Sequence, residues 1–226
     1  MRLGKAMALT LADAGANLIL HYNTSEAPAL ETQKEIEGKG VMAHLVQANL
    51  NDPQEAGAII EKTKEFGPLY ALVNNASIFE DLSLMETALE TWERHLRINL
   101  TAPFLLSQAF ARMKGEEEGR IVNILDWRAL RPNADHFPYT ISKAGLAALT
   151  RSLAVALAPN ITVNAIAFGA VLPPSDGGDV SGILKNVPAR RWAELDEVGE
   201  TLKFLLDGPP YITGEIIHLD GGRHLV

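Results

Sequence analysis

The sequence predicts an α/β fold of the doubly wound class, a parallel β-sheet with helices on both faces. Three observations favour this class. Short apolar runs alternate with helical segments, the runs are apolar at every position rather than every second one, and no linker or repeat interrupts the alternation. Strands without a polar face must be covered on both sides, as in a parallel sheet. Right-handed crossovers between successive strands then give the doubly wound order.

Composition limits the classes of function. The 226 residues suit a single domain, spanning residues 1–226, with one sizeable core. The net charge of -8 argues against nucleic acid and anionic membranes as partners. The absence of cysteine excludes disulfides, thiolate zinc sites and a cysteine nucleophile, and the 6 histidines lack metal-ligand spacing, so no metal is expected. Since no run of about 18 apolar residues is present, no membrane-spanning segment is expected.

The N-terminal residues predict an amphipathic helix. Leu3, Met7 and Leu11 share one helical face, and Gly15 is a typical residue for the C-terminal end of a helix. The same stretch imitates a weak signal peptide, with basic residues ahead of a short apolar run. Because that run is at the short limit of about 7–15 residues for a signal peptide, the helix is favoured.

The later elements follow from caps, breakers and apolar runs. Ser25 and Gly38 bound one helix, and the segments 52–55 and 87–90 each resemble a capping box at the start of another. Proline at the first helical position supports the first of these boxes. Strands are expected at 17–22, 41–48, 70–73, 121–125, 161–166 and 215–219, and further helices at 25–38, 53–66, 87–113, 142–158 and 195–206.

Polar residues that follow the strands are candidates for chemistry, because doubly wound folds bind ligands beyond the carboxyl ends of their strands. Three segments stand at such positions: residues 74–77, Asp126, and the segment from Tyr139 to Lys143. A tyrosine and a lysine four residues apart share a helical face. The adjacent ammonium lowers a tyrosine pKa from about 10, which makes Tyr139 a candidate acid or base. A tyrosine packed over a lysine stem would give the same spacing without any chemistry.

The order of these motifs resembles the short-chain dehydrogenase/reductase family over the whole chain. The resemblance implies a Rossmann fold and a nicotinamide-dependent oxidoreductase. Its catalytic residues would be Asp126, Tyr139, Lys143 and Asn99, with Lys143 holding the nicotinamide ribose and tuning Tyr139, and Asn99 fixing a proton-relay water. The segments that carry the resemblance are Asn74-Asn75-Ala76, Ile98-Asn99-Leu100, Tyr139 with Lys143, Val163-Asn164-Ala165-Ile166, Tyr211-Ile212-Thr213-Gly214 and Leu219-Asp220-Gly221-Gly222.

Asp126 departs from the family pattern, which has a serine about 13 residues before the tyrosine. A serine hydroxyl can donate to a substrate carbonyl, whereas a carboxylate only accepts, so Asp126 fits a substrate with N–H groups or a protonatable ring nitrogen. The chain is similar here to the pteridine reductases, including dihydromonapterin reductases, which have aspartate at this position. Phe79, where that subgroup stacks its pterin, and the C-terminal segment 220–225 also resemble it.

The implied reaction is hydride transfer to the carbon of a C=N bond in a dihydropterin, with Tyr139 and Asp126 relaying the proton to the ring nitrogen. Two neighbouring anions are costly, so this pair is expected to titrate together with Lys143. The substrate residues implied by the resemblance are Ser77, Phe79, Asp126 and Tyr139.

The segment after the first predicted strand favours NADP(H) over NAD(H). An enzyme that uses NAD commonly has an acid there, and this chain has none before Glu26. Hydroxyl and amide groups can bind a 2′-phosphate without repelling it. The resemblance places the cofactor against Arg2, Leu3, Gly4, His21, Tyr22, Asn23, Thr24, Ser25, Asn49, Leu50, Asn75, Ala76, Ser77, Tyr139, Lys143 and Gly169.

Two segments near the C-terminus differ from the family or extend the site. Phe168 stands where the family has proline, so we expect a changed loop over the nicotinamide and a narrower pocket. Residues 173–178 follow and are predicted to form a mobile substrate lid.

Two alternatives stay open: a carbonyl or 3-oxoacyl-thioester reductase of the same family, and a catalytically inactive nucleotide-binding subunit. For any of them we expect a cytoplasmic homo-oligomer, a dimer or tetramer, in which the long helices 99–113 and 142–158 pair across subunits. Its ligand would be a small molecule rather than nucleic acid or a membrane. The resemblance also leads us to expect an apolar strand and a glycine-rich turn ahead of Arg2, so that residues 1–226 form a domain that is incomplete at its N-terminus.

Overall fold

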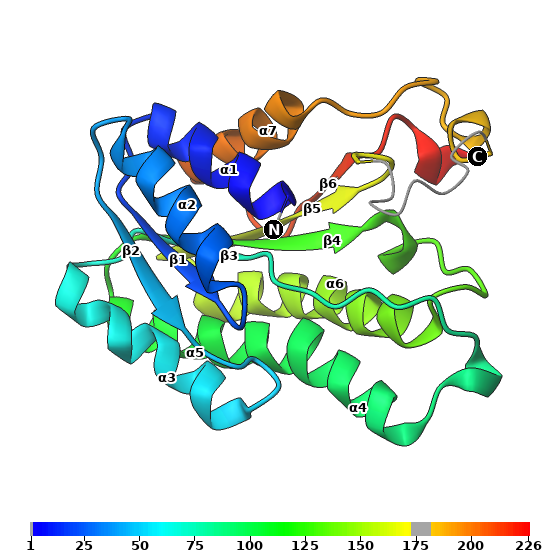
Figure 1. Ribbon diagram of the computed structural model, residues 1–226, viewed down its shortest axis with the longest axis horizontal. Coiled ribbons are helices and arrows are strands. Elements are labelled where there is room, and N and C mark those ends of the chain that lie inside the picture. Colours follow the sequence, from blue (N-terminus) through cyan, green and yellow to red (C-terminus); the bar gives the residue numbers. More distant parts are fainter. Residues whose placement is uncertain (1, 173–181) are drawn as a thin grey trace.

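Helices and strands alternate along the chain in the computed structural model (Figure 1), which describes residues 2–172 and 182–226. A π-helical turn, Arg97–Thr101, joins two of the helices, α4 and α5. The elements are α1 (Arg2–Asp13), β1 (Leu18–Tyr22), α2 (Glu26–Glu37), β2 (Ala43–Gln47), α3 (Pro53–Thr63), β3 (Ala71–Asn74), α4 (Leu89–Leu96), α5 (Ala102–Lys114), β4 (Gly119–Asp126), α6 (Phe137–Leu157), β5 (Ile161–Phe168), α7 (Leu195–Asp207) and β6 (Ile216–Leu219).

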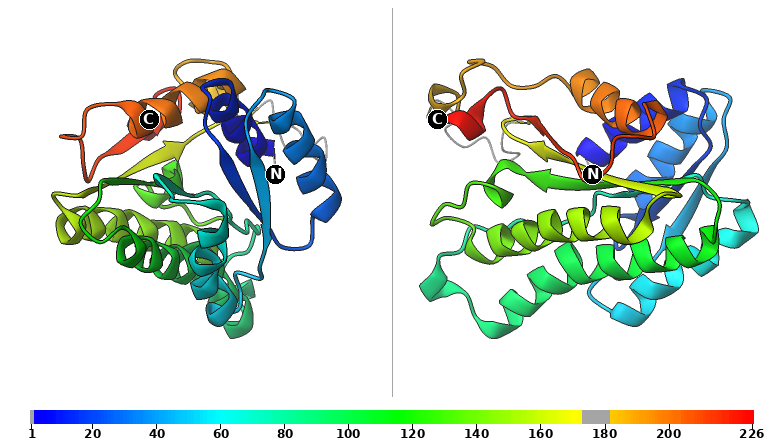
Figure 2. Two further views of the ribbon diagram at one scale, coloured as in Figure 1. Left: turned by 90° about the vertical axis from the view of Figure 1, so that its left-hand side faces the viewer. Right: turned by 180° about the vertical axis from the view of Figure 1, so that it is seen from behind.

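Every strand pair in the described chain is parallel, and helices lie on both faces of the strands. α1, α2 and α7 lie on one side and α3, α4, α5 and α6 on the other (Figures 1 and 2). The longest pairing joins β4 to β5, from Gly119 opposite Ile161 to Asp126 opposite Phe168. The predicted α/β class, with parallel strands covered on both faces, is therefore confirmed.

The strands form two sheets rather than one. β3, β4, β5 and β6 make a four-stranded sheet in that order, and β1 pairs with β2 in a second sheet. Among the described residues, β1 and β3 thus each have one edge without a ladder partner. Their side chains are mostly half-buried, whereas every residue of β5 is buried. The core is consequently densest around β4 and β5, whose carboxyl ends carry the candidate site.

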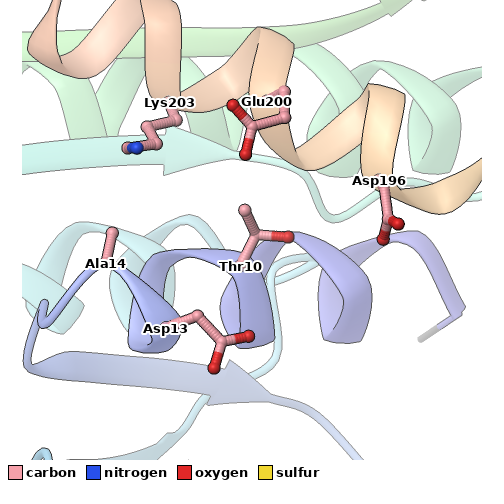
Figure 3. A pocket seen from close by; sticks show the side chains of 6 residues that line it. All are labelled: Thr10, Asp13, Ala14, Asp196, Glu200 and Lys203. Carbon is pink, nitrogen blue, oxygen red and sulfur yellow. The ribbon is translucent and has the colours of Figure 1, made fainter.

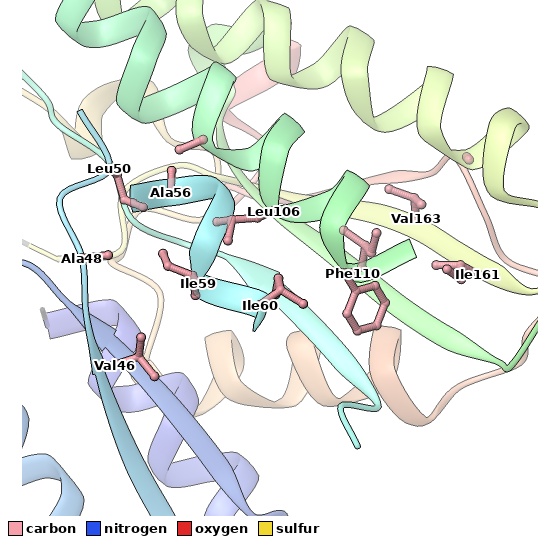
Figure 4. Close-up of a cluster of buried hydrophobic side chains, with 13 residues drawn as sticks. Val46, Ala48, Leu50, Ala56, Ile59, Ile60, Leu106, Phe110, Ile161 and Val163 are labelled. Atoms are coloured by element: carbon pink, nitrogen blue, oxygen red, sulfur yellow. The ribbon is translucent and has the colours of Figure 1, made fainter. Parts of the chain in front are cut away.

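Four apolar clusters hold helices to the sheets in the described chain, and two of them are much the largest. The first packs α3 and α5 against the strands and is centred on Phe110, which is fully buried (Figure 4). The second packs Met7 of α1 and Val198 and Leu202 of α7 against β4 and β5. Burying a side chain of this size contributes about 1.5–3 kcal/mol, so these clusters fix where the strand ends lie.

The capping box predicted at residues 87–90 is wrong. α4 begins at Leu89 with Ala88 as its N-cap, and Ser83 forms the capping box instead, with Glu86. Thr87 is not free to cap, because its hydroxyl donates to the Ser83 carbonyl at 2.7 Å.

The predicted start of α6 is also wrong. The helix begins at Phe137, five residues earlier than 142, with a proline at its N-terminus. His136 precedes it in a left-handed conformation, φ 49° and ψ 45°. Non-glycine residues rarely adopt that conformation, so propensity does not reveal this boundary. The earlier start places Tyr139 in the first turn.

α1 crosses α7 at Gly199, and this contact leaves no room for a side chain. A Cβ added to Gly199 would lie 2.6 Å from Thr10 Cβ. Thr10 lies on the side of α1 that faces α7 (Figure 3), where it lines a small polar hollow with Asp196 and Glu200. Thr10 is β-branched and its hydroxyl is bonded to the Ala6 carbonyl at 3.1 Å, so it cannot swing away.

Gly199→Ala is therefore expected to destabilise the protein by about 1–3 kcal/mol, the usual cost of overpacking. The matched control is Gly57→Ala in α3, where an added Cβ meets nothing within 4 Å. That change is expected to stabilise the protein by about 0.5–1 kcal/mol, because alanine favours a helix interior. Thermal unfolding of the two variants and the wild type measures both changes in stability. Equal stability of the two would contradict the close α1–α7 contact.

Candidate active site

Asp126, Tyr139 and Lys143 come together at the carboxyl end of the four-stranded sheet. Asp126 is the last residue of β4, and the other two lie in the first two turns of α6. The Lys143 ammonium donates to the Ile124 carbonyl at 2.8 Å and lies 5.7 Å from the centroid of the Tyr139 ring. All three are largely or fully buried, with Lys143 2% exposed and Tyr139 7%. The structure thus assembles three of the four predicted catalytic residues in one place.

Burial and mutual charge shift the pKa values of all three groups. Burial raises the pKa of Asp126 above its ordinary value, although the Arg128 backbone N–H and guanidinium oppose this. Burial and the Asp126 carboxylate raise the pKa of Tyr139 well above 10. Burial lowers the pKa of Lys143 to about 8, with Asp126 acting in the opposite direction. The groups therefore influence one another, as expected for a coupled set.

The expected lowering of the Tyr139 pKa by Lys143 is wrong for this structure. Desolvation of a buried phenol and the adjacent Asp126 carboxylate both disfavour the phenolate, and they outweigh the nearby cation Arg128. Tyr139 is consequently a neutral phenol near pH 7. A neutral phenol can donate a proton, and so the shift favours an acid role over a base role.

Arg128, which the sequence did not single out, orients Asp126. Its backbone N–H donates to Asp126 Oδ1 at 2.9 Å, and its guanidinium lies 3.6 Å from the same oxygen. The guanidinium also pairs with Asp135 at 2.8 Å. An aspartate that accepts from the backbone two residues later is a common turn, so the Asp126-x-Arg128 spacing was a usable signal. The sequence gives no comparable signal for the pairing of Arg128 with Asp135, which lies across the following loop.

Phe79 lies beside Tyr139, as the resemblance implied. The two rings meet edge to face with centroids 4.7 Å apart, and Phe79 also stacks on His136 at 4.0 Å. Phe79 is 55% exposed, so one part of the ring is open to a ligand while the other is fixed. His136 was not predicted as a site residue, because its position depends on the left-handed turn before α6.

Asn99 ties the loop of Ser77 to the helix of Tyr139. The Asn99 Oδ1 atom accepts from Ser77 Oγ at 3.1 Å and from the Ile78 N–H at 2.9 Å. Its Nδ2 group donates to the Ile78 carbonyl and to Ser142 Oγ, each at 3.0 Å. Ser142 Oγ in turn donates to the Tyr139 carbonyl at 2.7 Å. The fully buried Asn99 side chain is thus engaged by protein groups, and its role in holding a relay water stays a prediction.

The predicted cofactor residues gather at the ends of β1, β2, β3 and β5. Gly4, in the first turn of α1, lies so close to the loop after β3 that an added Cβ would be 2.8 Å from Asn75 Nδ2. Gly169 follows β5 and would place a Cβ 2.6 Å from Asp220 Cα. Both glycines thus permit close packing of the chain against itself at these positions, where a larger residue would not fit. The remaining predicted residues of this set in these regions are Arg2 and Leu3 at the start of α1, Tyr22, Asn23, Thr24 and Ser25 at and after the end of β1, Asn49 after β2, and Ala76 and Ser77 after β3.

Two of the predicted cofactor residues use their side chains within the protein. The His21 ring bonds to the Ala48 carbonyl at 2.8 Å, and burial lowers its pKa, so it joins the ends of β1 and β2 as a neutral group. The Leu50 side chain is 7% exposed and belongs to the first apolar cluster. Leu50 can therefore contact a nucleotide through its backbone and not through its side chain.

The expected narrowing of the pocket by Phe168 is wrong, and the changed loop over the nicotinamide stays a prediction. The Phe168 side chain is 4% exposed and packs into the second apolar cluster with Met7 and Val171. Because Phe168 is the last residue of β5, its direction is set by the pleat, which turns the ring toward α7. The predicted lid at residues 173–178 lies outside the described residues.

No group of metal-ligating side chains is found among residues 2–172 and 182–226. In the same part of the chain, no helix is long and apolar enough to cross a membrane.

The chain is similar to reductases of known structure and sequence. The family model described as enoyl-(acyl carrier protein) reductase matches residues 2–224. A 3-oxoacyl-[acyl-carrier-protein] reductase from Synechocystis sp. is 34% identical over 226 residues, which cover 97% of this chain and 92% of that protein.

Two solved structures combine high similarity with a bound nucleotide. FolM alternative dihydrofolate reductase 1 from Brucella canis, complexed with NADP, has a TM-score of 0.92 at 36% identity and covers 100% of this chain and 91% of that one. A short-chain dehydrogenase from Burkholderia cenocepacia, in complex with NADP, has a TM-score of 0.91 at 34% identity. The match covers 98% of this chain and 93% of that one. By its family match, its relatives and its fold, the chain belongs to the short-chain dehydrogenase/reductase family.

Proposed function

We propose that the protein is an NADPH-dependent reductase that reduces a C=N bond of a dihydropterin. The observation that carries the proposal is Asp126. Its carboxylate ends β4 beside Tyr139 and is held by Arg128, and both of these neighbours lie against the exposed ring of Phe79. A carboxylate can accept from the amino-pyrimidine edge of a pterin, and Phe79 offers a surface for its flat ring.

The residues present fit an NADP(H) cofactor. Gly4 brings the N-terminus of α1 against the loop of Asn75, and a helix N-terminus is a favourable place for a phosphate group. No carboxylate stands among residues 22–25 after β1, where it would repel a 2′-phosphate. The NADP complexes of the Brucella and Burkholderia structures support the same assignment. Lys143, one helical turn after Tyr139, would hold the nicotinamide ribose.

The chain's own residues manage the proton in this reaction. NADPH, when bound, would supply the hydride that the substrate carbon receives. Tyr139, a neutral phenol, then donates its proton to the ring nitrogen, and the resulting phenolate is stabilised by Arg128 and Lys143. Asp126 holds the substrate by accepting from its N–H groups. Asn99 keeps the loop of Ser77 in place against α6.

A 3-oxoacyl-thioester reductase is the second candidate, and the Synechocystis relative is the observation that favours it. In that reaction the substrate presents a carbonyl oxygen, which needs a donor. Ionised Asp126 is an acceptor only, so its position beside Tyr139 counts against this activity. An inactive nucleotide-binding subunit is the third candidate, and the assembled Tyr139 and Lys143 count against it.

A substrate panel separates these candidates. NADPH oxidation is measured with dihydrobiopterin, dihydrofolate and an acetoacetyl thioester. Turnover of a dihydropterin, with little or none of the thioester, is the expected result. Turnover of the thioester alone would overturn the proposal in favour of the second candidate, and turnover of none would favour the third.

The rate of reduction is expected to fall as pH rises through about 8, the pKa of Lys143. Below that pH the ammonium is charged and stabilises both the Asp126 carboxylate and the phenolate that forms on Tyr139. Above it the charge is lost, while Tyr139, with its pKa well above 10, still carries its proton. The pH profile of kcat/KM measures this. A profile that stays level well above pH 8 would contradict the assigned role of Lys143.

We also propose a cytoplasmic homo-oligomer, in which α5 and α6 pair with those of another subunit. Phe104 and Val155 lie on these helices with 41% and 82% of their surface exposed, as expected of side chains that a second subunit covers. The small residues Gly145 and Ala147 serve the chain's own core instead, since Gly145 packs on Leu100 and Ala147 is 2% exposed. The mass of the protein in solution measures the number of subunits.

A further inference from the structure

A hollow lined by positive charges lies beside the candidate active site. Its volume is about 700 Å³, within the range of small-molecule sites. Four of its lining residues are cations, and neither Asp nor Glu is among the lining residues of the described chain. This is the reverse of the whole protein, whose net charge is -8. The hollow is lined by Trp127, Arg131, Pro132, Asn133, Lys185, Asn186, Pro188, Arg190, Arg223 and Val226.

The basic side chains of the hollow have no carboxylate partner among the residues that the structure describes. Arg131 donates to the Arg223 carbonyl at 3.3 Å, and Arg190 to the Lys185 carbonyl at 2.8 Å. Arg191, which lies outside the hollow, by contrast pairs with Glu197 at 2.7 Å. The hollow therefore has positive charge available for an anion.

Trp127 is the wall that the hollow shares with the active site. It follows Asp126 directly, and its ring lies between two guanidinium groups. Arg223, on the side of the hollow, is 4.3 Å from the ring centroid, and Arg128, which holds Asp126, is 4.8 Å from it. Burial and Arg128 lower the pKa of Arg223, whereas the carboxylates of Asp126, Asp135 and Asp220 act in the opposite direction. Only the Trp127 side chain thus separates a ligand that contacts Asp126 from the hollow.

We propose that this hollow is the subsite for an anionic tail on the substrate, a substituent that carries carboxylates and extends from the reduced pterin ring. The inference rests on the proposed function and names the substrate class more closely: a pterin with a carboxylated tail, as in dihydrofolate, rather than one with a neutral side chain. The hollow is concave and of small-molecule size, which favours such a tail over the surface of an acidic carrier protein.

The test compares two substrates that share a ring and differ in the tail. Arg131→Gln/Lys185→Gln removes two exposed cations of the hollow, and Lys34→Gln/Lys62→Gln removes two exposed cations from α2 and α3 as the matched control. In the first variant KM for dihydrofolate is expected to rise roughly ten-fold, since exposed charge pairs are weak, while kcat/KM for dihydrobiopterin stays unchanged. The control is expected to match the wild type on both.

Three outcomes would overturn the subsite. They are an unchanged KM for dihydrofolate in the hollow variant, an equal loss with both pterins, and a loss confined to an acyl carrier protein substrate. A probe without the ring, p-aminobenzoyl-glutamate, keeps the inference separate from the proposed function. If the wild type reduces neither pterin, calorimetric binding of this probe that is lost in the hollow variant still supports the subsite, and no binding to the wild type overturns it.

Discussion

Tyr139→Phe is expected to lower kcat for dihydropterin reduction by about 10²- to 10⁴-fold, the usual contribution of a positioned general acid. The substitution removes only the hydroxyl group, which holds the proton that the ring nitrogen receives. KM is expected to change little, because the ring stays in place against Phe79. Steady-state kinetics with saturating NADPH measure the loss.

Tyr211→Phe is the matched control for this variant. Tyr211 is 99% exposed, so removal of its hydroxyl is expected to leave kcat unchanged. Circular dichroism of both variants shows whether the fold is kept. A Tyr139→Phe enzyme that retains half or more of the wild-type kcat would remove Tyr139 from the proton transfer.

Asp126→Ser is expected to change which substrate the enzyme prefers. Loss of the carboxylate removes a charged acceptor for the pterin N–H groups, so kcat/KM for dihydropterin is expected to fall by about 10- to 100-fold. The new hydroxyl can donate to a carbonyl oxygen, so reduction of an acetoacetyl thioester is expected to rise or to appear. The ratio of the two kcat/KM values is the measurement.

Asp207→Ser, at the exposed end of α7, is the control for the loss of a carboxylate. It is expected to leave both rates as they are in the wild type. An unchanged dihydropterin rate in Asp126→Ser would show that the carboxylate has no part in binding or proton relay. The proposal of a pterin substrate would then lose the observation that carries it.

Much of the fold could be predicted from local patterns. Apolar runs and breakers located each of the six described strands within a few residues, because the strands are apolar and bounded by polar or flexible residues. The placement of Asp126 and Tyr139 followed from the rule that sites form beyond the carboxyl ends of parallel strands, and that of Phe79 from the resemblance. In these cases local sequence and tertiary structure agree.

What could not be predicted depends on contacts between distant residues. The start of α6 is set by His136, which adopts a left-handed conformation where its ring stacks on Phe79, 57 positions earlier in the chain. The direction of the Tyr139 pKa shift depends on how deeply the phenol is buried beside Asp126, which spacing alone does not give. The basic hollow combines the segment after Asp126 with the C-terminal turn, so no single stretch of sequence reveals it.

The most direct test of the proposed reaction is to follow the hydride itself. NADPH carrying deuterium at the reactive position of C4 of the nicotinamide is supplied with a dihydropterin, and the product is examined by mass spectrometry and NMR. We expect one deuterium on the ring carbon of the former C=N bond, and no incorporation in the Tyr139→Phe variant beyond its residual rate. Deuterium that enters only the hydroxyl-bearing carbon of a reduced acetoacetyl thioester, with none in the pterin, would contradict the account.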